Sequence, residues 1–113
     1  MRNILTISIL LFTLLFQCTI SLAANTHKSV VINMYDSYFE PKNITIHTGE
    51  KIIWINKGKK DHTVTSDNGD FNSGHIHPGA SVSYTFTKPG TYDYSCTMHS
   101  FLMFGMKGKI TVK

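Results

Sequence analysis

Residues 81–96 read SVSYTFTKPGTYDYSC, an alternation of polar and apolar side chains that is interrupted once by Lys-Pro-Gly. Apolar or aromatic side chains occupy every second position from Val82 to Phe86, and again from Tyr92 to Cys96. A period of two is typical of a strand with one buried face, and Pro-Gly is typical of a turn. The stretch therefore predicts two neighbouring strands of an all-β protein.

The same pattern continues in both directions along the chain. Turn-forming runs such as Asp67-Asn68-Gly69-Asp70 interrupt it at roughly regular intervals, and no stretch has a convincing helical face. We expect strands at Ser29 to Tyr35, Asn43 to His47, Lys51 to Asn56, Thr63 to Ser66, Ser81 to Thr87, Thr91 to Cys96 and Lys107 to Val112. Short strands without a long connection predict a two-sheet antiparallel Greek-key sandwich.

The amino terminus has the composition of a signal peptide. A single positive charge at Arg2 precedes an apolar run from Ile4 to Phe16, and the chain becomes polar after the small pair Ala23-Ala24. The apolar run is shorter than the roughly 20 residues that a membrane-spanning helix needs. We therefore expect residues 1–24 to be a cleaved signal peptide, residues 25–113 to form one domain, and the protein to be exported to the periplasm.

One cysteine remains in the expected mature chain. Cys18 leaves with the signal peptide, so Cys96 has no disulfide partner, and a lone thiol in an oxidising compartment needs an explanation. The mature chain has ten lysines against seven acidic residues, and it has no lysine cluster that would favour nucleic acid. A mature domain of 89 residues is small enough to benefit from a bound metal.

Metal-ligating side chains occur at His62, just before one expected strand, and in Cys96-Thr97-Met98-His99, just after another. Because a sandwich brings strand ends together, one thiolate and two imidazoles can converge with the thioether of Met103 or Met106. This is the ligand set of a type 1 copper site with a weak axial sulfur. Zinc is the competing ion, although thioether is a poor zinc ligand and structural zinc sites usually have more thiolates.

Several short motifs follow one another along the mature chain in a specific order and spacing. They are Phe39-Glu40-Pro41, Gly49 through Asn56, His62-Thr63-Val64, Tyr84-Thr85-Phe86, Pro89-Gly90-Thr91-Tyr92, Tyr94-Ser95-Cys96-Thr97-x-His99 and Met106 through Val112. In this order they resemble the cupredoxins, the blue copper proteins of the plastocyanin, pseudoazurin and amicyanin kind. The resemblance implies a cupredoxin-like sandwich in which His62, Cys96 and His99 bind one copper ion strongly and a methionine binds it weakly.

Two features of the expected metal site depart from the family pattern. Short-loop cupredoxins have their methionine three residues past the second histidine, where this chain has Leu102, and Met103 and Met106 follow. We expect Met106 to be the axial ligand, because the family's methionine stands just before the closing strand, followed by one residue and a glycine. Met103 is the alternative. Thr63 replaces an asparagine that ties the ligand loops together in several relatives, so we expect a weaker tie.

The resemblance implies a small exported protein that carries single electrons between redox enzymes and has no catalytic group or small-molecule substrate. We expect a monomer that docks transiently on a cytochrome, dehydrogenase or oxidase, partly through the apolar run Phe101-Leu102-Met103-Phe104. A periplasmic copper chaperone or buffer is the alternative, with the His75/His77 pair as transient ligands. An enzyme with Cys96 as nucleophile is disfavoured, because no orienting residue is evident.

Overall fold

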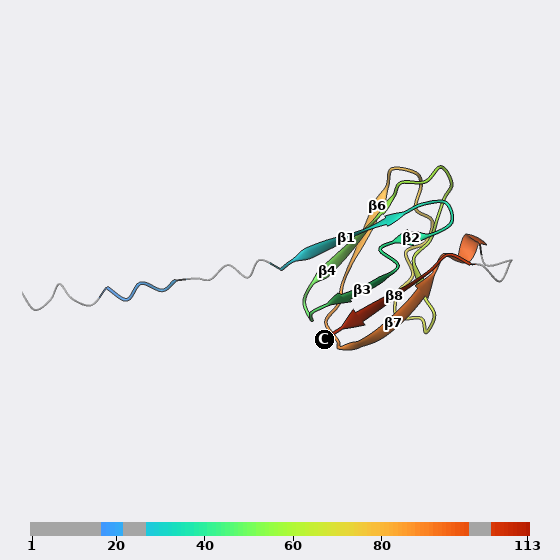
Figure 1. The fold of residues 1–113 in the computed structure, drawn as a ribbon. Helices are drawn as coiled ribbons and strands as arrows, with labels where there is room; N and C mark the ends of the chain where they lie inside the picture. The colour runs from blue at the N-terminus through green and yellow to red at the C-terminus, as the bar shows by residue number, and fades with distance from the viewer. Residues whose placement is uncertain (1–16, 22–26, 100–104) are drawn as a thin grey trace, which may run out of the picture.

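The computed structural model describes residues 17–21, 27–99 and 105–113. Its strands are β1 Ser29–Met34, β2 Phe39–Glu40, β3 Asn43–Ile46, β4 Lys51–Asn56, β5 Thr65–Ser66, β6 Ser81–Thr85, β7 Gly90–Ser95 and β8 Lys107–Val112, and one 3-10 turn, η1, spans Thr97–His99. In these residues the strands form two four-stranded sheets, ordered β2-β1-β4-β6 and β3-β8-β7-β5, that pack as a sandwich (Figure 1).

The expected all-β sandwich is confirmed, with sheets that are mixed rather than purely antiparallel. β1 runs parallel to β4 and β3 runs parallel to β8, whereas the other strand pairs are antiparallel. The parallel pairs arise because the chain crosses to the opposite sheet and returns before each second strand is added. β2 was not expected, because two residues are too short to show a period.

Burial alternates along the central strand β4, as its sequence predicts. Ile52, Trp54 and Asn56 are buried, while the residues between them are partly exposed. Tyr94 on β7 meets this face from the opposite sheet, with its ring centroid 5.7 Å from that of Trp54 in an edge-on arrangement. The two sheets therefore enclose a dry aromatic and aliphatic core, and apolar burial of this kind is the main stabilising contribution to such a fold.

One end of the sandwich gathers the segments that carry the candidate ligands. Figure 1 shows β7 ending and β8 beginning at the end that carries η1, with the C-terminus at the opposite end. The segments after β1 and β4 leave the sheet together, since Lys57 N donates a hydrogen bond to Met34 O at 2.8 Å. The parallel pairing of β1 with β4 therefore places the loops that follow these two strands side by side.

The expected signal peptide falls mostly outside the described residues. Of residues 1–24, only 17–21 are described, and they belong to no strand or helix. No helix within the described ranges is long and apolar enough to cross a membrane. Cleavage after residue 24 stays a prediction.

Candidate metal centre

Three segments bring candidate ligands to the η1 end of the sandwich. Cys96 follows the last residue of β7, and Met106 precedes the first residue of β8. The ladder between these strands extends by one step, since Cys96 N donates to Met106 O at 3.0 Å. His62 is fixed by two backbone hydrogen bonds with Ile76, at 3.1 and 2.8 Å. Each candidate is thus held by backbone bonds at a strand end or bridge.

The imidazole of His62 and the thiol of Cys96 face each other inside the protein. His62 Nδ1 lies 3.7 Å from Cys96 Sγ, and both residues are 0% exposed. The sulfur also accepts the backbone N–H of Thr63 at 3.3 Å. Met106 is buried as well, so its thioether is shielded from bulk water.

The other two candidates fall partly or wholly outside the described residues. The backbone of His99 closes η1, three residues after Cys96, but its side chain is not described. Met103 and the rest of the run Phe101 to Phe104 lie in the undescribed segment. Among the side chains that are described, no three His, Cys, Asp and Glu groups are arranged to hold a metal ion. His99 and Met103 therefore stay predictions as ligands.

The second nitrogen of His62 is paired with Asp36, in the segment after β1. Nε2 lies 3.1 Å from Asp36 Oδ1, and the same oxygen accepts the backbone N–H groups of Lys59 at 2.8 Å and Lys60 at 3.1 Å. The N–H of Lys60, then that of Lys59 and the His62 ring, hold the pKa of the Asp36 carboxyl below its ordinary value. Asp36 is thus an ionised acceptor at neutral pH.

Thr63 ties the two ligand segments together through its hydroxyl. Thr63 Oγ1 accepts the backbone N–H of Thr97 at 2.9 Å, lies 3.0 Å from Thr97 Oγ1, and accepts the hydroxyl of Thr65 at 3.2 Å. Thr63 follows His62 and Thr97 follows Cys96, so each of these bonds to Thr97 joins one ligand segment to the other. The hydroxyl of Thr63 therefore joins the two ligand segments, at the position where the family pattern has the side-chain amide of an asparagine.

Asn56 braces the loop on the other side of His62. Its buried side chain donates to Lys60 O at 2.8 Å and to Ile76 O at 2.9 Å, and its Oδ1 accepts the N–H of Gly58 at 2.9 Å. Sequence reasoning placed Asn56 at a strand end but missed this role. A polar residue at a core position of an alternating strand is the signal that could have found it, because buried amides need partners.

His75 and His77 share a carboxylate at the surface. His77 Nδ1 lies 2.9 Å from Asp61 Oδ1, and His75 Nδ1 lies 4.0 Å from Asp61 Oδ2. Both imidazoles are mostly exposed. These three side chains are not arranged to hold a metal ion, and the same is true of every other such group in the described part of the chain.

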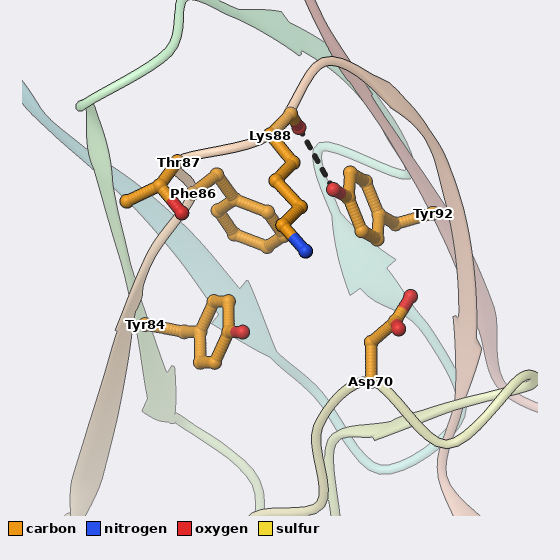
Figure 2. A pocket seen from close by; sticks show the side chains of 6 residues that line it. All are labelled: Asp70, Tyr84, Phe86, Thr87, Lys88 and Tyr92. Atoms are coloured by element: carbon orange, nitrogen blue, oxygen red, sulfur yellow. Dashed lines mark hydrogen bonds between the residues drawn. The ribbon is translucent and has the colours of Figure 1, made fainter.

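A hollow of about 140 Å³ lies beside the turn that leads into β7 (Figure 2). Its walls include the rings of Tyr84 and Phe86, whose centroids are 4.9 Å apart, and Tyr92, whose hydroxyl donates to Lys88 O at 2.8 Å. No cysteine, histidine or methionine is among its lining residues, so it offers no soft metal ligand and is separate from the candidate centre.

Comparison with known proteins finds one family model and several named relatives that match this sequence. The family model of the cupredoxin-like domain matches residues 6–112. The plastocyanin of Scenedesmus fuscus is 36% identical over an 86-residue alignment that covers 66% of this chain and 86% of that protein. Amicyanin-alpha of Methylorubrum extorquens is 29% identical over a 111-residue alignment that covers 87% of this chain and 90% of that protein.

Solved structures share the same architecture. An oxidised amicyanin mutant superposes with a TM-score of 0.66 at 28% identity, covering 74% of this chain and 81% of the amicyanin. A Cu-containing nitrite reductase from Thermus scotoductus gives a TM-score of 0.67 at 26% identity, but the match covers only 22% of that enzyme. The purple cupredoxin of Nitrosopumilus maritimus, at 24% identity and a TM-score of 0.64, shares the fold.

Proposed function

Because this chain belongs to the cupredoxin-like domain family, we propose that it binds one copper ion and carries single electrons between larger redox proteins. The relatives named plastocyanin and amicyanin support a carrier. The match to about a fifth of the nitrite reductase, against most of the amicyanin, also favours a carrier over an enzyme. Solved relatives include a Cu-containing nitrite reductase and a reduced Cu(I) form of an amicyanin mutant, which supports copper as the metal.

The observation that carries the proposal is the buried pair of His62 Nδ1 and Cys96 Sγ at 3.7 Å. Metal–nitrogen and metal–sulfur bonds of roughly 2.0–2.1 and 2.3 Å, meeting at about 110–120°, separate the two donors by about 3.5–3.8 Å. The separation of 3.7 Å falls within this range, so the two side chains fit as ligands of one ion. A thiol with no exposed surface is also poorly placed to attack a substrate, which argues against a cysteine enzyme.

We assign His62, Cys96 and His99 as the strong ligands and Met106 as the axial ligand, with Met103 as the alternative. The burial of Met106 and its backbone bond to Cys96 support its assignment. A thiolate with two imidazoles and a weak thioether is the ligand set of a type 1 copper site, and such a site supplies a reversible Cu(I)/Cu(II) couple.

The surrounding residues keep the site rigid and dry, which favours electron exchange with little rearrangement. The N–H of Thr63 stabilises negative charge on the Cys96 sulfur, and the hydroxyl of Thr63 holds the two ligand segments together. Phe39 and Tyr94, buried with ring centroids 4.7 Å apart, exclude water from the core beneath the site. No step of this function needs a general acid, a general base or a substrate pocket.

We further propose that residues 1–24 direct export to the periplasm and that the mature protein acts as a monomer. Its partners would be a cytochrome, dehydrogenase or oxidase of the same compartment, which it touches through a small and transient interface. The apolar run Phe101 to Phe104 would form part of that interface. The mildly basic charge of the chain favours partners with an acidic surface.

A periplasmic copper chaperone or buffer is the second candidate. The exposed side chains of Met98, His75 and His77 favour it, because exposed thioether and imidazole groups can pass copper to another protein. Cyclic voltammetry of the copper-loaded mature protein separates the two functions. A carrier gives a reversible one-electron couple with copper retained in both states. Irreversible reduction with release of copper would exclude the carrier and leave the buffer.

A further inference from the structure

We infer that Asp36 is the positioning residue for His62: it holds Nε2–H of the ring and thereby directs the lone pair of Nδ1 toward Cys96. The positioning follows from the geometry of the described residues alone. Its effect on copper rests on the proposed function.

The fold brings Asp36 to His62 from 26 residues away in sequence. β1 and β4 are parallel neighbours in register up to Met34↔Asn56, and the next residue, Lys57, donates its N–H to Met34 O. The segments that leave both strands therefore run together over the same end of the sheet. Asp36 lies in the first of these segments, and the loop that leads to His62 is the second.

The donors around Asp36 determine which nitrogen of His62 carries the proton. Lys59 and Lys60 present backbone N–H groups to Asp36 Oδ1, and a backbone N–H can only donate. An ionised carboxylate can only accept. His62 Nε2, at 3.1 Å from the same oxygen, must therefore be the nitrogen that carries the N–H. In that tautomer Nδ1, on the side of Cys96, carries the lone pair.

Gly58 keeps the space that this arrangement requires. A Cβ at position 58 would overlap Asp36 Oδ1 and would lie 3.1 Å from His62 Nε2. The backbone of Gly58 is not in the left-handed region, so conformational freedom does not explain the glycine. A side chain at position 58 would therefore take the space that the Asp36 carboxylate occupies between this loop and the His62 ring.

A carboxylate that accepts the outer N–H of a ligating histidine orients the ring and raises its basicity. A more basic imidazole favours Cu(II) over Cu(I), so Asp36 should lower the reduction potential of the copper-loaded protein. Asp36 comes from a segment that contains no expected ligand, whereas Gly58 lies in the loop that leads to His62.

The test follows the Nε2–H proton of His62 by NMR in the metal-free protein, whose fold is checked by spectral dispersion. In the wild type this proton should appear at low field and exchange slowly with solvent. Asp36→Ala should move it to higher field and speed its exchange about tenfold, the change expected for losing one partly buried hydrogen bond. Asp36→Asn, which keeps the acceptor oxygen without the charge, should give an intermediate result.

Gly58→Ala should reproduce the effect of Asp36→Ala with the carboxylate still in the chain, because the added Cβ displaces it. Asp61→Ala is the matched control, since it removes the neighbouring carboxylate that pairs with His77 instead. The control should leave the His62 signal unchanged. A wild-type signal in Asp36→Ala, or an equal loss in Asp61→Ala, would overturn the positioning role.

The same variants, loaded with copper, test the effect on the metal. Asp36→Ala and Gly58→Ala should raise the reduction potential relative to the wild type and to Asp61→Ala. An unchanged potential would overturn the influence of Asp36 on the metal. Failure of every protein, wild type included, to bind copper would instead refute the proposed function, and the NMR result would still decide the positioning.

Discussion

Thr63→Val tests the tie between the two ligand segments with the smallest change of shape. The substitution replaces the hydroxyl by a methyl group and removes a hydrogen bond from Thr97 N at 2.9 Å, together with contacts to the hydroxyls of Thr97 and Thr65 at 3.0 and 3.2 Å. Each such bond contributes about 0.5–1.5 kcal/mol net. Thr97 is exposed, so water can replace part of what it loses. We expect the free energy of unfolding to fall by about 1–2 kcal/mol.

The measurement is urea denaturation of the metal-free protein, followed by the fluorescence of Trp54. Thr45→Val is the matched control, because Thr45 is exposed on β3 and away from the metal centre. It should change the free energy of unfolding by less than about 0.5 kcal/mol. Equal stabilities of Thr63→Val and wild type would refute the tie. Loss of the tie should also speed the release of copper to a chelator in Thr63→Val alone.

Three further predictions concern the metal loop and the core. Met106→Leu should raise the reduction potential, because losing a donor sulfur disfavours Cu(II), while Met103→Leu should leave it nearly unchanged; the reverse pattern in voltammetry would make Met103 the axial ligand. Burial raises the pKa of Tyr94 to about 12, against about 10 in an unfolded chain. The folded state favours the neutral phenol, so its contribution is complete below about pH 10 and is lost as the pH rises toward 12, by roughly 2–3 kcal/mol. Tyr94→Phe should remove that part of the alkaline decline in stability, and an unchanged decline would show that other groups cause it. Phe101→Ser with Phe104→Ser should slow electron exchange with the partner protein in stopped-flow mixing while colour and potential stay nearly constant; a parallel loss of copper would show that these side chains belong to the core.

The strands could be predicted from the sequence because their alternation is strong. The run Lys51 to Asn56 was expected as a strand and is β4 with the same bounds, and its buried Trp54 follows the same period. Pairing direction was not accessible, because the chain changes sheets between the strands that become parallel neighbours. β2, at Phe39–Glu40, was missed because a strand of two residues is too short to show an alternating pattern.

The candidate site was only partly accessible for a related reason. Cys96 and His62 carry donor atoms whose chemistry is visible in the residue type, so their pairing could be inferred and the structure places them 3.7 Å apart. The roles of Thr63, Asp36 and Asn56 rest on hydrogen bonds. Their partners are backbone groups or side chains, and most of these belong to residues distant in sequence. Such roles depend on which loops the fold brings together, and neither composition nor spacing reports this. Thr63 illustrates the limit, since its bonds to Thr97 become visible only in the fold, and whether this tie is weaker than one made by asparagine stays a prediction.

Addition of Cu(II) to the mature protein, followed in the visible range, tests the assignment of the copper centre most directly. We predict an intense thiolate-to-copper band that grows until one equivalent of copper is bound. The band should be absent from Cys96→Ser, and circular dichroism should show that this variant keeps its fold. Copper should stabilise the wild type against heat and not the variant, because an ion that binds only the folded state stabilises it by mass action. A wild-type protein that stays colourless with copper, or a Cys96→Ser variant that keeps the band, would contradict the account.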